Sequence, residues 1–283
     1  MKTINAMQLK ALVRNKAREL NVPAQLVLQS YVLERLLERI SCSRFKESFI
    51  VKGGFLLASV IGLDTRTTKD LDATIRNLTV SEEELRTMFE EVINIVSEDS
   101  LSFELGNTEE IREGDEYPGL RLHLVARFEQ LAIPLAVDVT AGESIVPPPL
   151  ARDFPRLFTE GTFSALSYQL ETVAAEKIET VLARSTANTR ARDFYDIFVL
   201  DRLQGTLLTP SRLHDALVAT TKKRNSIAVL TGFNEAVAVL INDESLNRLW
   251  EAYVKKNSYA SGIDFKSTCI SVISLLERAG FVD

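Results

Sequence analysis

A strand, a glycine turn and a helix start follow one another without a gap over residues 49–61. Phe49-Ile50-Val51 is a β-branched and aromatic run, Gly53-Gly54 stops it, and the apolar residues that come next begin a helix. Two glycines at a helix N-terminus leave backbone N–H groups that can bind phosphate, although a tight turn without a ligand has the same pattern. Because the Gly-Lys-Ser/Thr ending of a P-loop is missing, the pattern disfavours a kinase or ATPase of that class.

An Asp-x-Asp pattern lies one helix length after this turn. In a strand, Asp70 and Asp72 point to one face and Leu71 points to the other. Their Cα atoms would then lie about 6.5 Å apart, which suits two divalent cations held about 3.5 to 4 Å apart for phosphoryl transfer. For the pair alone, the solvated face of an edge strand is the alternative. Since the glycine turn precedes the pair so closely, both features could meet at one strand end.

A third carboxylate lies in the apolar run at residues 131–140. Alternation places Val137 and Val139 on one face and Asp138 on the other, among small residues that leave room for a metal ion or a substrate. If this strand neighbours the Asp-x-Asp strand, three carboxylates converge, and Asp138 could hold a metal or deprotonate an attacking hydroxyl. The alternative is a side chain that faces water near the strand end.

Lys177 interrupts the apolar stripe of a helix predicted over residues 167–184. The lysine either extends to solvent at the edge of the stripe or neutralises a triphosphate. On the next predicted helix, Asp193 and Asp196 share one face at spacing i, i+3. They are either a cap and a surface ion pair, or they position Lys177 and Arg192 for binding phosphates. The sequence alone does not decide between these roles.

Helical spacing of apolar residues begins the chain, β patterns follow in its middle, and helical spacing returns after Pro147-Pro148-Pro149. We therefore predict an α/β fold with N-terminal helices at 1–45 that pack on the core, a small mixed-sheet α/β core at 46–150, and a mainly helical domain at 151–283 that carries Lys177 and the Asp-x-x-Asp pattern. The predicted helices lie over 7–43 with a break at 21–23, over 82–96 after a Ser81 cap, and over 167–184, 192–203, 211–220, 232–241, 246–255 and 265–279. In the middle of the chain the predicted strands lie over 101–105, 120–128 and 131–140, and a hairpin joins the last two.

The composition excludes several classes of protein. With 283 residues the chain can bury a large core without disulfides, and its longest apolar run, about nine residues, is too short to cross a membrane. Cys42 and Cys269 are the only cysteines and no secretory signal is visible, so we expect reduced thiols in the cytoplasm and no cysteine-based metal site. The net charge of −6 argues against a surface coated with basic residues, although a local basic patch for nucleic acid stays open.

The ordered set of motifs resembles a known family. Over about residues 49–200 the chain is similar to the AbiEii/AbiGii nucleotidyltransferase toxins, the toxin half of type IV toxin–antitoxin and abortive-infection systems. The motifs that carry this resemblance are Phe49-Ile50-Val51-Lys52-Gly53-Gly54-Phe55, Arg66-Thr67-Thr68-Lys69-Asp70-Leu71-Asp72, Val137-Asp138-Val139, Glu176-Lys177-Ile178-Glu179 and Arg192-Asp193-Phe194-Tyr195-Asp196.

The resemblance implies a DNA polymerase β-like nucleotidyltransferase core followed by a helical domain. Many relatives have a small Ser or Thr where this chain has Phe55, so the expected hydroxyl contact to phosphate is missing there. Arg66 matches a common arginine that would contact phosphate or support the strand. The implied residues are Asp70, Asp72, Asp138 and Lys177 for catalysis, the same three aspartates for Mg²⁺ or alternatively Mn²⁺, and Lys52, Gly53, Gly54, Arg66, Lys177, Arg192, Asp193 and Asp196 for the nucleotide.

The function implied by this resemblance is transfer of a nucleoside monophosphate from an NTP to an RNA acceptor. The expected acceptor is the 3′ end of tRNA, so that the reaction blocks translation, and the expected partner is a separately encoded antitoxin. No membrane partner is expected. Two alternatives remain, namely a small-molecule nucleotidyltransferase of the antibiotic-modifying kind and an NTP-binding module that has lost turnover. An anionic pocket would favour the small-molecule acceptor, and a basic pocket would favour RNA.

Overall fold

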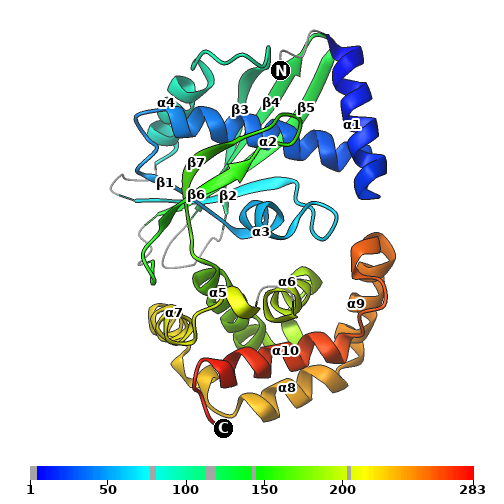
Figure 1. Ribbon diagram of the computed structural model, residues 1–283. Coiled ribbons are helices and arrows are strands. Elements are labelled where there is room, and N and C mark those ends of the chain that lie inside the picture. The colour runs from blue at the N-terminus through cyan, green and yellow to red at the C-terminus, as the bar shows by residue number, and fades with distance from the viewer. Residues whose placement is uncertain (1–4, 77–80, 112–118, 142–144, 203–204) are drawn as a thin grey trace. The chain divides into compact units, whose positions relative to one another are not determined.

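The structure of the chain is a computed structural model that describes residues 5–76, 81–111, 119–141, 145–202 and 205–283 (Figure 1). Contacts divide the chain into two compact units. The first unit contains Met1–Glu143 and Leu150–Ser167, and the second contains Ser144–Pro149 and Tyr168–Asp283. The proline run at 147–149 therefore belongs to the second unit, although the segments on both sides of 144–149 belong to the first.

A seven-stranded mixed sheet forms the centre of the first unit, with the strand order β3-β4-β5-β2-β1-β7-β6. The neighbours β2 and β5 are parallel, as are β1 and β7, and the other neighbouring pairs are antiparallel. The predicted α/β class with a mixed sheet is thus confirmed. The strands are β1 (Phe49–Lys52), β2 (Asp70–Ile75), β3 (Ser102–Ile111), β4 (Gly119–Phe128), β5 (Leu131–Ala141), β6 (Leu150–Pro155) and β7 (Thr162–Ser167).

Alternation along β4 and β5 separates an apolar face from a polar one. Phe128 pairs with Leu131 across a two-residue connection, which confirms the predicted hairpin. Leu122 and its partner Val137 are fully buried. The next pair along, Arg121 and Asp138, lies on the opposite face and is only partly buried. The sheet therefore buries one face in the core and keeps the other for polar side chains.

Among its described residues the first unit has four helices, and α2 lies across the strands in Figure 1, where it contacts β5 and β7. α1 packs on α2 after a break at Asn21, whose φ of 53° is left-handed. Ser81 starts α4 with a capping box that includes Glu84, so the predicted cap is confirmed. These helices are α1 (Ala6–Leu20), α2 (Ala24–Cys42), α3 (Gly53–Ile61) and α4 (Glu82–Ile93).

The second unit is built from helices around an aromatic core. Phe194 packs on Phe265 with ring centroids 5.0 Å apart, and Tyr195 packs on Tyr259 at 4.9 Å. Its helices are α5 (Leu170–Arg184), α6 (Ala191–Arg202), α7 (Pro210–Lys223), α8 (Phe233–Asn242), α9 (Glu244–Lys256) and α10 (Phe265–Arg278), with short 3₁₀ turns η1 (Ser185–Ala187), η2 (Gly205–Leu207), η3 (Ile227–Leu230) and η4 (Ser258–Ala260). In the part of the chain that the structure describes, none of the helices combines the length and the apolar character that crossing a bilayer requires.

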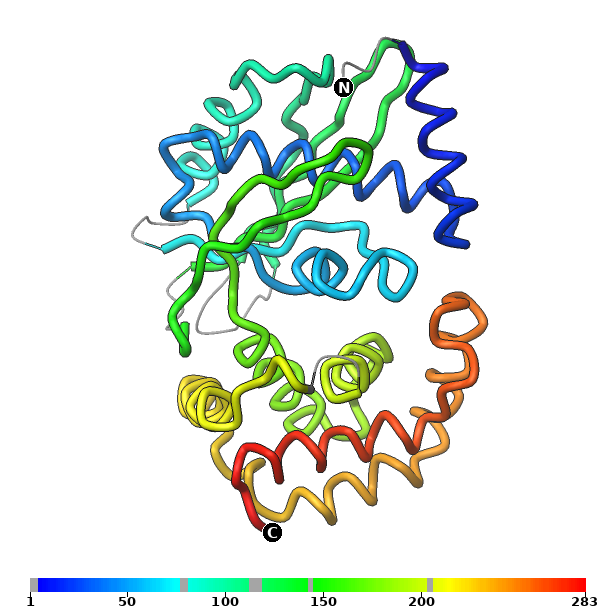
Figure 2. The backbone as a smooth tube through the Cα atoms, in the orientation of Figure 1, coloured from blue at the N-terminus to red at the C-terminus, as the bar shows by residue number. Residues whose placement is uncertain are grey.

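The sequence pattern does not predict β6 and β7, which lie in the range assigned above to the helical domain. The two strands form a hairpin at the end of the sheet, and they run side by side in Figure 2. In β6 the only fully buried residue is Phe154. Burial alternates along β6, but Arg152 takes a half-buried position and Ala151 an exposed one, so apolar and polar residues do not alternate in the sequence. The sheet therefore continues to Ser167, and the helical part begins with α5 rather than at residue 151.

Candidate active site

The glycine turn lies directly against the Asp-x-Asp strand. Lys52, the last residue of β1, pairs with Asp72 on antiparallel β2. Gly53 has a φ of 60°, and a Cβ at this position would lie 2.3 Å from Asp72 Oδ2. The N–H of Gly54 donates to the same oxygen across 3.2 Å. The backbone conformation and the close carboxylate both require glycine, and one N–H at the start of α3 already binds an anionic oxygen of the chain itself.

Arg66 lies beside the same turn, in the segment that leads into β2. The residue is 1% exposed, and its Nη1 donates to the carbonyl oxygen of Thr67 across 2.8 Å. A Cβ on Gly54 would come within 2.4 Å of Nη1 of Arg66 and 2.8 Å of Thr68 Oγ1. The guanidinium thus occupies the space that a side chain at Gly54 would need. Of the two roles expected for Arg66, this burial favours support of the turn and strand.

The two aspartate strands are neighbours in the sheet. β2 and β5 are parallel, with Asp72 beside Asp138 and Asp70 beside Ala136. Since paired positions in a sheet point to the same face, all three aspartates lie on the polar face. Asp70 and Asp72 are partly buried, and the side chain of Asp138 is 17% exposed. The structure therefore brings the glycine turn and the three predicted carboxylates together in one place.

Arg121 binds both oxygens of the third carboxylate. Its Nε donates to Asp138 Oδ1 across 2.7 Å, and its Nη2 donates to Oδ2 across 2.8 Å. The hydrogen bonds to Asp138 raise the pKa of Arg121 above its ordinary value. Sequence reasoning missed this residue. Alternation along the strand places Arg121 on the polar face, but the β4–β5 register is needed to show that it lies opposite Asp138.

The charged pairs form one row across four strands. Lys52, Asp72, Asp138 and Arg121 occupy paired positions on β1, β2, β5 and β4, so that two aspartates lie between two cations. Lys52 is 4% exposed, and its Nζ donates to Thr140 Oγ1 across 2.7 Å. Lys52, which is predicted to bind the nucleotide, is therefore buried and hydrogen-bonded to a side chain of the sheet itself.

In the second unit, both aspartates of the Asp-x-x-Asp pattern bind Lys177. The Nζ of Lys177 on α5 lies 2.8 Å from Asp193 Oδ1 and 2.7 Å from Asp196 Oδ2 on α6. The side chains of Lys177 and Asp196 are 13% and 0% exposed. This is neither a cap nor a surface ion pair, because the group is buried and its cation comes from another helix. Arg192, the other cation predicted here, is exposed on α6.

Phe55 does not have the role expected of a small hydroxyl residue at this position, because its side chain packs in the core. The residue is 8% exposed, and its ring stacks on Phe154 of β6 with the centroids 6.1 Å apart. Phe154 in turn stacks on Phe163 of β7 at 5.7 Å. The side chain after the glycine turn therefore contributes to the core of the first unit.

The carboxylates fit a divalent cation as a pair rather than as a group of three. Among the residues that the structure describes, no three His, Cys, Asp or Glu side chains are placed to hold a metal ion. Asp138 has both oxygens on Arg121, whereas Asp70 and Asp72 lie on one face of β2. Mg²⁺ commonly takes one or two protein carboxylates together with phosphate and water oxygens. The residues present therefore fit a Mg²⁺ ion that takes some of its ligands from protein carboxylates and the others from the phosphates of a nucleotide and from water.

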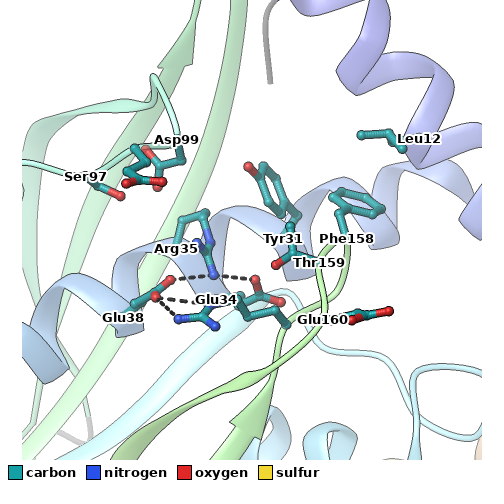
Figure 3. A pocket seen from close by; sticks show the side chains of 12 residues that line it. Leu12, Tyr31, Glu34, Arg35, Glu38, Ser97, Asp99, Phe158, Thr159 and Glu160 are labelled. Atoms are coloured by element: carbon teal, nitrogen blue, oxygen red, sulfur yellow. Dashed lines mark hydrogen bonds and ion pairs between the residues drawn. The ribbon is translucent and has the colours of Figure 1, made fainter. Parts of the chain in front are cut away.

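A cavity of about 450 Å³ lies elsewhere in the first unit (Figure 3). Arg35 on α2 contacts Glu34 and Glu38 at 2.7 and 2.5 Å, and the rings of Tyr31 and Phe158 pack beside this network. Burial raises the pKa of Glu34 to about 7. None of the residues that line the cavity is a predicted site residue, so the cavity is separate from the nucleotide site that the motifs indicate.

A family model described as "Nucleotidyl transferase AbiEii toxin, Type IV TA system" matches residues 35–266. The chain belongs to this family and is a nucleotidyltransferase of the toxin–antitoxin class, which confirms the resemblance seen in the motifs. Membership of the family also implies a nucleotide substrate and an antitoxin partner.

Two solved structures are similar to the chain. One is a candidate nucleotidyltransferase from H. pylori, 12% identical, with 92% of this chain and 96% of that chain covered and a TM-score of 0.49. The other is JHP933 from Helicobacter pylori, 11% identical, with 90% and 92% covered and a TM-score of 0.49. Among curated proteins, the search found no match.

Proposed function

We propose that this nucleotidyltransferase transfers a nucleoside monophosphate from an NTP to the 3′ end of tRNA, releases pyrophosphate and so blocks translation. The observation that carries the proposal is the contact between the glycine turn and Asp72, in register with Asp138. A helix N-terminus favours phosphate, and neighbouring carboxylates favour the divalent cation that accompanies a triphosphate. The tRNA acceptor rests on the resemblance to the family.

We propose a separate task for each group on the polar face of the sheet. Asp70 and Asp72 would hold Mg²⁺, or Mn²⁺ in its place, and the cation would neutralise negative charge on the phosphates during transfer. The N–H groups at Gly53 and Gly54 would orient phosphate oxygens at the start of α3, where the Gly54 N–H would exchange Asp72 Oδ2 for a phosphate oxygen. Asp138 accepts the proton of the attacking acceptor hydroxyl.

The cations are proposed to act in different ways. The role of Lys177 in stabilising charge on the triphosphate rests on the resemblance to the family, and its two ion pairs hold the amine in one orientation. Arg192 is exposed and can bind an anion directly. Lys52 and Arg66 are buried, so their proposed contribution is indirect, through the hydrogen bond of Lys52 to Thr140 and the packing of Arg66 beside Gly54.

The test is a labelling assay with purified protein, Mg²⁺, total tRNA and each α-labelled NTP in turn. We expect label on the RNA with one or more NTPs, and we expect Asp72→Ala to abolish it. Asp153→Ala is the matched control, because Asp153 is an exposed carboxylate on β6 of the same unit. This control should keep the activity of the unchanged chain.

The outcomes separate the proposal from its competitors. NTP binding without pyrophosphate release, with tRNA or with any other acceptor, would indicate a module that has lost turnover. Pyrophosphate release without labelled RNA would indicate another acceptor, such as a small molecule with a free hydroxyl. Either result would overturn the proposed tRNA reaction.

The cellular setting is also part of the proposal. We propose that the protein acts in the cytoplasm, where tRNA is available, and that the separately encoded antitoxin neutralises it. The two cysteines support a reducing compartment, since Cys42 and Cys269 are both free thiols. Co-expression with the gene next to it in its operon should relieve growth arrest if that gene encodes the antitoxin.

A further inference from the structure

Asp138 is poorly placed to act as a base or a metal ligand while Arg121 holds both of its oxygens. The two hydrogen bonds, at 2.7 and 2.8 Å, use one lone pair on each oxygen, and the guanidinium is itself a cation that repels a metal at the same carboxylate. The backbones of the two residues are fixed opposite each other by the β4–β5 register. For Asp138 to act, a side chain has to move and the backbone does not.

Arg121 is the side chain that is free to move. It is 34% exposed, against 17% for Asp138, so it can turn toward solvent without leaving a buried space. Its charge is attracted by more than one carboxylate, because Asp70 and Glu109 also act on it besides Asp138. Glu109 is its paired neighbour on β3. Arg121 therefore has other anionic partners within reach when it leaves Asp138.

The strongest competing anion at this site would be a triphosphate. A guanidinium binds carboxylate and phosphate through the same planar fork, so a phosphate group can replace Asp138 as its partner. The glycine turn lies against Asp72, which occupies the same row of the sheet as Asp138 and Arg121. A nucleotide bound at the turn would thus place phosphates near this row.

We propose that Arg121 is a positioning residue that holds Asp138 away from the metal in the NTP-free chain and releases it when the triphosphate of an NTP binds the guanidinium. This inference rests on the proposed function, because it places the NTP and the metal on this face of the sheet. It accounts for the absence, in the described residues, of a group of three carboxylates placed for a metal. The third carboxylate is present but is bound to Arg121.

Metal binding without NTP tests the first half of this inference. Mn²⁺ binding is measured as the loss of the electron paramagnetic resonance signal of free Mn²⁺. The chains compared are the unchanged chain, Arg121→Ala and Arg121→Ala/Asp138→Asn. We expect Arg121→Ala to bind Mn²⁺ about threefold to tenfold more tightly, since a cation is removed and a carboxylate is released. The double variant should lose this gain. Arg127→Ala is the control, because Arg127 lies on the same strand β4 as Arg121 but forms its ion pair with Glu104 of β3.

Nucleotide binding tests the second half. We expect Arg121→Ala to bind a non-hydrolysable NTP analogue in the presence of Mg²⁺ about tenfold more weakly, as loss of a phosphate-binding arginine requires. Thermal unfolding of each variant identifies a chain that has not folded, and Arg121→Gln then replaces Arg121→Ala. Unchanged Mn²⁺ affinity in a folded Arg121 variant would overturn the inference, and unchanged analogue affinity would exclude the triphosphate as the group that releases Asp138.

These measurements do not depend on turnover. If the labelling assay fails while the Mn²⁺ result holds, the proposed reaction is wrong and the control of Asp138 by Arg121 stands. If RNA is labelled while Mn²⁺ affinity is unchanged, the reaction stands and the role of Arg121 is wrong.

Discussion

Asp72 on β2 and Asp138 on β5 lie side by side on parallel neighbouring strands, although α4, β3 and β4 separate them along the chain. Parallel neighbouring strands require such a crossover connection. Here the last element of the connection is β4, which pairs with β5 and places Arg121 beside Asp138. The connection between the two aspartate strands therefore supplies the cation that binds the third carboxylate.

Gly53→Ala should destabilise the first unit and abolish nucleotidyl transfer. The residue has a φ of 60°, and the new Cβ would meet Asp72 Oδ2 at 2.3 Å. Gly262→Ala is the control, because its φ of 80° is also positive while nothing lies within 4 Å of the added Cβ. The control should lose about 1 kcal/mol through backbone strain alone. Urea unfolding should show a larger loss for Gly53→Ala, and an equal loss would mean that the contact with Asp72 costs nothing.

Lys177→Met should reduce the free energy of unfolding by about 3 kcal/mol or more, since it leaves two buried carboxylates without their cation. Asp196 is the critical partner, with a side chain that is 0% exposed. The triple variant Lys177→Met/Asp193→Asn/Asp196→Asn should recover most of this stability, because it buries no unpaired charge. If Lys177 acts on the triphosphate, the triple variant stays inactive. Activity that returns with stability would assign Lys177 a structural role only.

The stability of the chain should fall as the pH rises from about 5 to about 7. Burial raises the pKa of Glu34 to about 7, so the folded chain retains a proton that the unfolded chain releases at lower pH. The contribution of Glu34 is then present below its unfolded pKa and is lost as the pH rises through the folded value, by at most about 3 kcal/mol. Glu34→Gln cannot titrate, and its urea unfolding at pH 5 and pH 8 should differ less. If the free energy of unfolding differed equally between pH 5 and pH 8 in both chains, this would contradict the raised pKa of Glu34.

Arg66→Lys should lower both stability and activity despite keeping the charge. An ammonium cannot fill the space beside Gly54 or reproduce the planar fork, and we expect a loss of about 2 kcal/mol. Arg44→Lys is the comparison, because its ion pair with Glu91 is largely exposed and should contribute less than about 0.5 kcal/mol. Comparable losses in thermal unfolding would show that Arg66 supports nothing beyond its own charge.

The sequence predicts those parts of the site whose partners are close along the chain. The turn at Gly53 and the pair Asp70 and Asp72 are separated by one helix, and their local patterns are sufficient to indicate a strand, a turn and a strand. The position of Asp138 on a polar face also follows from alternation alone. That it lies beside Asp72 stays conditional until the strand order is known, because alternation identifies a face but no neighbour.

Register and burial account for what the sequence does not predict. Arg121 is one of several polar residues on β4, and only the pairing with β5 distinguishes it from His123 two positions along. In β6, Arg152 takes a half-buried position, so the apolar and polar residues of this strand do not alternate in the sequence. For Lys177 the apolar stripe is visible in the sequence, yet its buried ion pairs with Asp193 and Asp196 become evident only when α6 is placed beside α5.

The division of the chain restricts how it can be cut. Because 144–149 belong to the second unit and 150–167 return to the first, three peptide junctions connect the units. A fragment that ends at residue 149 would lack β6 and β7 and would expose β1 as a new sheet edge, one residue from the glycine turn. A fragment that begins at residue 150 would carry a hairpin without its sheet. Neither half obtained by cleavage between residues 149 and 150 is a complete folding unit, so loss of activity on that truncation would report unfolding of the sheet as much as loss of Lys177.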